Sequence, residues 1–210
     1  MGLKQNLFKQ FRKPTGSLGR VIGWLMSIKN KDRASWTIDN LRINPGDKLL
    51  EIGYGPGVTL GKAANRLTSG FIAGIDHSEI MLKQATKRNK KHIENNKVKL
   101  EQGTIWDLEY PDNHFDTIYG SNVHFFWKDP VEEFTELVKL LKPEGQLLMV
   151  FQPRWTTTED EVKEVAEKTK IQYEKVGLTN IKTDFKKMSP VTCISIIGKK
   201  ISPIQATNDF

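Results

Sequence analysis

The stretch LLEIGYGPG at residues 49–57 decides the fold of this chain. Its apolar start is typical of a buried strand, and its Gly53-x-Gly55-x-Gly57 end is typical of a turn whose backbone a ligand can approach closely. Nineteen positions beyond Gly57, Asp76 ends the next apolar run, where a carboxylate can accept hydrogen bonds from a ribose. This arrangement predicts a nucleotide-type cofactor site.

The charge beside the turn narrows the kind of cofactor. The glycine spacing differs from G-x-G-x-x-G, the pattern that places a pyrophosphate on a helix N-terminus. Glu51 stands next to the turn, and its carboxylate would repel the phosphates of a dinucleotide but suit a cofactor with an ammonium and a sulfonium. We therefore expect S-adenosylmethionine, and an NAD-dependent oxidoreductase is one alternative.

Beyond residue 44, short apolar runs alternate with amphipathic or polar stretches, a pattern that indicates a parallel sheet with helices on both faces. The predicted strands are 48–52, 71–76, 98–102, 115–120 and 146–151, followed by 180–187 and 191–198. The predicted helices are 34–41, 60–67, 78–89, 131–141 and 159–176. The last two strands are too close in sequence for a helical crossover, so we expect them to form an antiparallel hairpin at one sheet edge.

Composition places limits on the class of protein. With 210 residues, 38% hydrophobic and 27% charged, the chain has the length of one domain and the composition of a soluble globular protein. We find no apolar run of bilayer length and no secretory signal, so we expect a cytoplasmic protein. Cys193 is the single cysteine and lies in a run typical of a buried strand. No metal-ligand spacing is present, so we expect no metal.

The net charge of +7 is concentrated at the N-terminus, where residues 1–33 hold eight basic residues and one acidic residue. We divide the chain into a basic amphipathic helical arm (1–43), a catalytic domain (44–200) and a tail (201–210). We expect the arm to close over the pocket as a lid. The alternatives are that it binds an anionic membrane surface as a peripheral contact, or RNA.

At this point the sequence resembles a known family, the class I S-adenosylmethionine-dependent methyltransferases, and within it the small-molecule group that includes ubiquinone and menaquinone biosynthesis methyltransferases. The matching pieces lie at 49–57, 75–85, 101–127 and 141–150. The resemblance implies a Rossmann-like three-layer fold with a mostly parallel seven-stranded sheet and a reversed last hairpin. It also implies S-adenosylmethionine as cofactor and S-adenosylhomocysteine as product.

The resemblance also assigns roles to single residues. Glu51 and the turn would hold the methionine part of the cofactor, Asp76 both ribose hydroxyls, and Met81 the adenine face. The full set implied for cofactor binding is Glu51, Gly53, Tyr54, Gly55, Gly57, Asp76, His77, Met81, Thr104, Ile105, Trp106, Ser121 and Asn122. An acidic residue is common in the family where this chain has Thr104, whose neutral oxygen makes a weaker acceptor for the adenine amino group.

We expect the methyl acceptor to bind beside the residues that follow the predicted strands 115–120 and 146–151. The substrate candidates are His124, Phe125, Trp127 and Arg154. His124 could orient or deprotonate a nucleophile, and its alternative role is a hydrogen-bonded wall residue. We expect a small-molecule acceptor rather than nucleic acid, and a non-catalytic S-adenosylmethionine-binding protein is the remaining alternative. The acceptor, the atom methylated and the oligomeric state do not follow from the sequence.

Overall fold

A computed structural model describes residues 31–202, which fall into two compact units that meet in sequence at residue 108. Most of the predicted arm and tail therefore lies outside the described residues, and the lid stays a prediction. No helix among residues 31–202 is long and apolar enough to cross a membrane.

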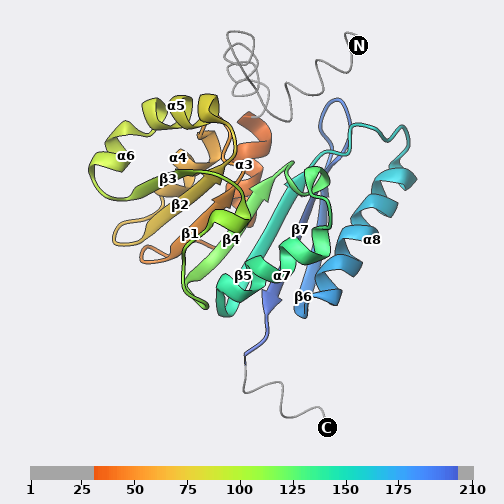
Figure 1. Cartoon of the computed structure of the whole chain (residues 1–210). Helices are drawn as coiled ribbons and strands as arrows, with labels where there is room; N and C mark the ends of the chain where they lie inside the picture. Colours follow the sequence, from red (N-terminus) through yellow and green to blue (C-terminus); the bar gives the residue numbers. More distant parts are fainter. Residues whose placement is uncertain (1–30, 203–210) are drawn as a thin grey trace. The chain divides into compact units, whose positions relative to one another are not determined.

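The first unit is a three-stranded parallel sheet in the order β3-β2-β1 with its helices (Figure 1). Its elements are α3 (Lys31–Asn40), β1 (Lys48–Ile52), α4 (Val58–Ala64), β2 (Phe71–Asp76), α5 (Glu79–Arg88), α6 (Lys90–Glu94), β3 (Val98–Gln102) and the 3-10 turn η1 (Ile105–Asp107). The register pairs Glu51 with Gly74 and Asp76 with Gln102. The ends of β1 and β2 therefore lie at the same edge of the sheet.

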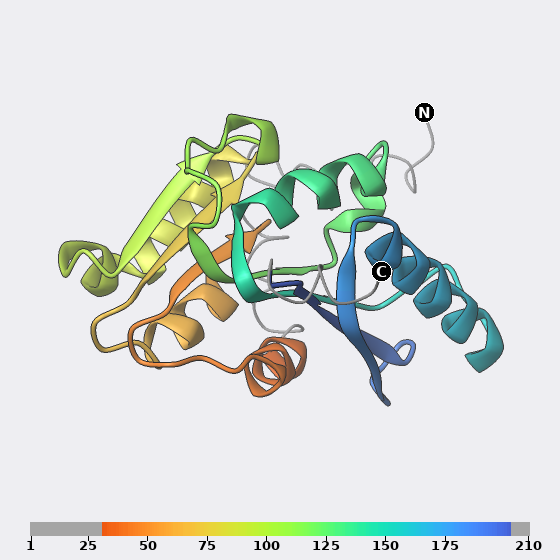
Figure 2. The same ribbon diagram turned by 90° about the horizontal axis from the view of Figure 1, so that it is seen from below.

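The second unit contains four strands in the order β4-β5-β7-β6. Its elements are β4 (Phe115–Ser121), the 3-10 turn η2 (His124–Phe126), α7 (Pro130–Leu140), β5 (Leu141–Phe151), α8 (Glu159–Lys175), β6 (Leu178–Lys186) and β7 (Cys193–Lys200). β4 and β5 are parallel, whereas β7 is antiparallel to both β5 and β6. Figure 2 shows α8 running alongside the β6–β7 pair.

Local sequence signals explain where the elements begin. The turn before β1 closes because Asp47 accepts a hydrogen bond from the Asn44 amide at 2.8 Å. α5 begins at Ser78, whose side chain caps the Met81 amide, and α7 begins at Asp129 with Pro130 in the first turn. α8 begins with a capping box in which Thr158 and Glu161 exchange hydrogen bonds.

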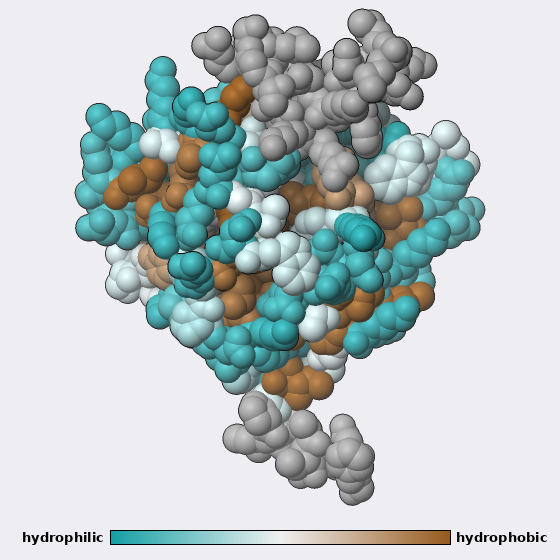
Figure 3. Space-filling model, viewed as in Figure 1, coloured by the Kyte–Doolittle hydropathy of each residue, from teal (hydrophilic) through white to brown (hydrophobic). Residues whose placement is uncertain are grey.

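The predicted mostly parallel seven-stranded sheet with an antiparallel C-terminal hairpin is confirmed. Several element bounds differ from the sequence prediction, among them the following three. α5 ends at Arg88 and a second short helix, α6, follows it; β5 begins at Leu141, directly after α7; and β7 begins at Cys193, whose side chain is fully buried as predicted. The surface over α5 and α6 is mostly hydrophilic in Figure 3, consistent with a solvated face for this lysine-rich stretch.

Candidate functional site

The glycine turn that follows β1 has a left-handed backbone at all three glycines, with φ of 67° at Gly53, 52° at Gly55 and 74° at Gly57. A β-carbon added to Gly55 would meet no atom within 4 Å. One added to Gly57 would lie 2.9 Å from the β-carbon of Ala85 in α5. Gly55 therefore leaves its side of the turn open, whereas Gly57 lets α5 pack against the backbone.

Asp76 is joined to this turn by direct hydrogen bonds. Its Oδ2 accepts from the Gly55 amide at 2.8 Å and its Oδ1 from the Ser78 amide at 2.9 Å, so the carboxylate spans the glycine turn and the start of α5. Burial raises the pKa of Asp76, and this effect outweighs the two amide donors and nearby His77, which lower it. Each carboxylate oxygen has capacity for a second donor, so a pair of hydroxyls can still bind.

Glu51 and Tyr54 flank the turn as buried side chains. Glu51 lies within β1 and is 2% exposed. The hydroxyl of Tyr54 donates to the backbone oxygen of Glu101 in β3 at 3.0 Å, and burial raises the pKa of this phenol. The Tyr54 side chain therefore joins the turn to β3.

The next predicted residues differ widely in exposure. Met81 is 2% exposed in the first turn of α5, and the His77 ring lies at the surface with Nδ1 3.8 Å from Asp76 Oδ1. In the loop after β3, Ile105 is buried whereas Trp106 is 53% exposed. Trp106 thus offers a ring face that no core packing requires.

Asp107 is a polar residue of this loop that the sequence reasoning missed. Its Oδ2 accepts both the backbone amide and the hydroxyl of Thr104, each at 2.8 Å, and these donors lower the pKa of Asp107. The Thr104 hydroxyl proton is therefore committed to Asp107, and its oxygen, which already accepts the Asp107 amide, keeps one further lone pair. The signal was the Thr-x-x-Asp spacing of a capping box.

In the second unit, Ser121 ends β4 and Asn122 follows with φ of 56°. The Asn122 side-chain oxygen accepts from the Gln152 amide at 2.8 Å, and the Asn122 amide donates to the Val150 oxygen at 3.0 Å. Asn122 therefore ties the end of β4 to the end of β5. The oxygen of its carboxamide is committed to the Gln152 amide.

His124 is a buried ring with one nitrogen that has no hydrogen-bond partner. Its Nε2 lies 3.5 Å from the hydroxyl of Thr169, which donates its own proton to the Val165 oxygen. With the Thr169 proton on the Val165 oxygen, the tautomer that donates from Nε2 matches this contact, and Nδ1 has no hydrogen-bond partner among residues 31–202. Burial lowers the pKa of His124 to about 3, so the ring is neutral near pH 7 and can accept a hydrogen bond.

Aromatic side chains surround His124 within the same unit. The rings of Phe125 and Phe151 lie 4.3 and 4.5 Å from the imidazole, and Trp127 lies at 6.3 Å. Phe125 also meets Trp155, which is 60% exposed, edge-on at 4.8 Å. The cluster thus extends from a buried imidazole to an exposed indole. Arg154 lies beside Trp155 in sequence and is exposed.

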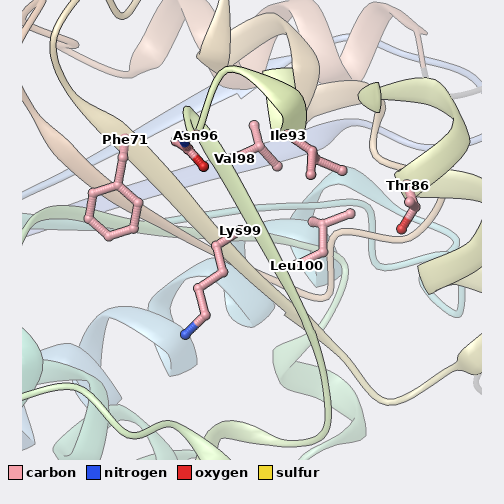
Figure 4. Close-up of a pocket in the computed structure, with 7 residues that line it drawn as sticks. All are labelled: Phe71, Thr86, Ile93, Asn96, Val98, Lys99 and Leu100. Carbon is pink, nitrogen blue, oxygen red and sulfur yellow. The ribbon is translucent and has the colours of Figure 1, made fainter. Parts of the chain in front are cut away.

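A cavity of about 480 Å³ lies elsewhere in the first unit (Figure 4). It is lined by Phe71, Thr86, Ile93, Asn96, Val98, Lys99 and Leu100. Figure 4 shows these side chains on both sides of β3, so the cavity is a surface hollow around the edge strand. It contains none of the predicted site residues, and the chemistry of the glycine turn and Asp76 makes that turn the stronger candidate.

Comparisons with known proteins agree with this geometry. The family model described as a methyltransferase domain matches residues 49–145. An uncharacterized methyltransferase, YdaC of Bacillus subtilis, is 29% identical over 181 residues, which are 86% of this chain and 98% of that protein. A demethylmenaquinone methyltransferase of Symbiobacterium thermophilum is 32% identical over 106 residues, which are 50% of this chain and 42% of that protein.

Solved structures show the same fold. A SAM-dependent methyltransferase from Aquifex aeolicus matches with a TM-score of 0.62 at 18% identity, over 83% of this chain and 95% of that one. Phosphoethanolamine N-methyltransferase 2 of Haemonchus contortus, in complex with S-adenosylmethionine, matches with a TM-score of 0.66 at 17% identity, over 82% of this chain and 53% of that one.

The methyltransferase-domain match over residues 49–145, the relatives named methyltransferases and the shared fold support an S-adenosylmethionine-dependent methyltransferase. The predictions of the family, the enzyme class and the cofactor are confirmed. The first unit of this methyltransferase fits such a cofactor on its own chemistry, since it combines an open glycine backbone at Gly55 with a carboxylate that has free acceptor capacity at Asp76.

Proposed function

We propose that this methyltransferase transfers the methyl group of S-adenosylmethionine to an oxygen, nitrogen or carbon of a small-molecule acceptor that has an apolar body. The observation that carries the cofactor half of the proposal is the hydrogen bond between Asp76 Oδ2 and the Gly55 amide. It joins the predicted ribose acceptor to the most open glycine of the turn. The cofactor would lie along this turn, with its ribose hydroxyls on Asp76.

The loop after β3 supports a position for the adenine. Trp106 presents an exposed indole, and Thr104 keeps an acceptor oxygen because its proton is held by Asp107. Asp107 itself also supplies an exposed carboxylate three positions further on. An adenine in this loop would stack on the indole and donate its amino group to one of these oxygens.

Methyl transfer from S-adenosylmethionine requires little acid–base catalysis from the protein. The bound cofactor supplies a methyl group activated by a sulfonium, whose positive charge disperses in the transition state. The protein then has to hold the acceptor in line and exclude water. His124 is buried and is neutral because of its lowered pKa, so we place it as a wall residue of the aromatic cluster rather than as a proton donor.

The acceptor half of the proposal rests on the aromatic cluster around His124. The half-buried Phe125 and the exposed Trp155 form its outer part, and a flat or branched apolar molecule would bury these rings. The names of two relatives, demethylmenaquinone methyltransferase and sterol 24-C-methyltransferase, mention apolar acceptors of this kind. Arg154 would hold an anionic group where the acceptor carries one.

The test is an acceptor screen with methyl-labelled S-adenosylmethionine and the full chain. We expect label to enter the organic-soluble small-molecule fraction of a metabolite extract, and we expect Asp76→Ala to remove this signal. Label recovered in RNA, with binding that weakens steeply as salt increases, would overturn the small-molecule acceptor. Tight cofactor binding without transfer to any fraction would instead support a non-catalytic binding protein.

A further inference from the structure

Two side chains at the far end of α5 hold the backbone of the glycine turn. Arg88 Nε donates to the Pro56 oxygen at 2.8 Å, and Asn89 Nδ2 donates to the Gly57 oxygen at 3.0 Å. The donors are adjacent in sequence, and so are the acceptors. Two consecutive carbonyl groups of the turn are therefore fixed by one short segment that lies 32 residues further along the chain.

The Asn89 side chain has one defined orientation. Its Nδ2 also donates to the Ala85 oxygen at 3.0 Å, so both amide hydrogens are used. Because both partners are carbonyl oxygens, only the nitrogen can face them. Asn89 is 2% exposed, so water does not compete for these bonds.

The space that Asn89 occupies depends on two glycines. A β-carbon on Gly57 would lie 2.5 Å from Asn89 Nδ2, and one on Gly61 in α4 would lie 2.5 Å from Asn89 Oδ1. The Gly57 oxygen also accepts the Gly61 amide at 3.2 Å, which is the first helical hydrogen bond of α4. Asn89 thus joins the glycine turn, the start of α4 and the end of α5 at one point.

We propose that Asn89, assisted by Arg88, is a positioning residue that preorganises the glycine turn for the cofactor. The inference rests on the proposed place of the cofactor along that turn. Three glycines with positive φ give an untethered turn many accessible conformations, and ordering them at the moment of binding weakens affinity. Asn89 orders the turn during folding, and neither Asn89 nor Arg88 needs to touch the cofactor.

The primary test is calorimetry of S-adenosylhomocysteine binding to full-length variants. Asn89→Ala should weaken binding about tenfold, the effect expected when a buried hydrogen bond that fixes the turn is lost. Gly61→Ala, a change that normally favours a helix, should weaken binding in the same direction because its methyl group displaces the Asn89 carboxamide. Arg88→Ala should weaken it less, since Arg88 is exposed.

The matched control is Lys97→Met. Lys97 Nζ donates to the Leu67 oxygen at 2.7 Å, so this variant also removes a side-chain tether from a loop carbonyl of the same unit, but not from the glycine turn. We expect its affinity to stay within about twofold of the wild type. Amide hydrogen exchange supplies a readout independent of activity, and protection of the Gly61 amide should fall in Asn89→Ala and not in Lys97→Met.

Steady-state kinetics separate positioning from general damage. Asn89→Ala should raise KM for S-adenosylmethionine and leave kcat within about threefold. Unchanged affinity in Arg88→Ala and Gly61→Ala, both folded, would overturn the proposal even if Asn89→Ala failed to fold. If Asp76→Ala also binds S-adenosylhomocysteine normally, the assumed cofactor position is wrong. If Asp76→Ala alone loses binding, the cofactor position is right and only the positioning role of Asn89 and Arg88 is wrong.

Discussion

At the scale of single residues, glycines in one turn serve different physical needs. Gly55 has open space where a side chain would be, as expected of a backbone that a ligand approaches. Gly57 and Gly61 are instead required by the close approach of Asn89 and Ala85. The sequence predicted the turn, but only the packing of α5 distinguishes the glycine with open space beside it from those that pack against the protein.

The buried His124 leads to a prediction about stability and pH. Its pKa is about 3 in the folded chain and about 6.5 when unfolded, so the unfolded chain binds the extra proton between these values. The folded state should therefore lose stability as pH falls below 6.5, by about 1.4 kcal/mol per pH unit from this group.

Denaturant unfolding of the wild type and His124→Gln between pH 7 and pH 4.5 measures this slope. The variant, which has no titrating group at this position, should show a shallower decline. Parallel pH profiles for the two proteins would mean that the ring is solvated or protonated in the folded state. The same measurement on His92→Gln gives a comparison: burial also lowers the pKa of the partly buried His92, so this variant should flatten the profile less than His124→Gln does.

At the scale of elements, helix starts were predictable because their signals are local. Ser78, Asp129 and Thr158 stand where the sequence placed the beginnings of α5, α7 and α8, within a residue or two. The break between α5 and α6 was not predictable, because it occurs at Asn89, whose side chain bonds to a turn 32 residues away. A tertiary contact, which no local pattern records, sets that boundary.

Two helix caps provide a matched pair of variants. Ser78→Ala and Thr158→Ala should each lower the free energy of unfolding by about 1 kcal/mol, because each removes an acceptor for a first-turn amide. Only Ser78 adjoins Asp76, so Ser78→Ala should also weaken S-adenosylhomocysteine binding several-fold. Calorimetry and denaturant unfolding on both variants check this. If Ser78→Ala and Thr158→Ala bind S-adenosylhomocysteine equally well, the start of α5 does not contribute to the cofactor site.

At the scale of the whole molecule, sequence sufficed for the fold and the cofactor class. Alternating apolar runs predicted each strand, and the order of the family pieces predicted S-adenosylmethionine. The hydrogen bonds between side chains of the site were harder to predict from the sequence. The bond from the Tyr54 hydroxyl to β3 was not expected, although Tyr54 stays a predicted cofactor residue; Asp107, which holds Thr104, was not expected either. Both contacts depend on how separate segments come together.

The acceptor could not be predicted because acceptor-binding residues follow the shape of one molecule and share no fixed spacing. The sequence predicted substrate contacts for a run of polar and aromatic residues, His124, Phe125 and Trp127. Only the packing shows that Trp155 is the exposed end of the same cluster. Arg154 has an exposed side chain, and its part in anion binding stays a prediction.

Calorimetric titration of S-adenosylhomocysteine into the wild type and Asp76→Ala tests the central claim most directly. The wild type should bind one equivalent, and Asp76→Ala should bind at least about a hundredfold more weakly, since it loses charge-assisted acceptors for both ribose hydroxyls. NAD should give no heat with either protein. Equal binding by the two proteins, or binding of NAD instead, would contradict the assignment of this turn and carboxylate as the cofactor site.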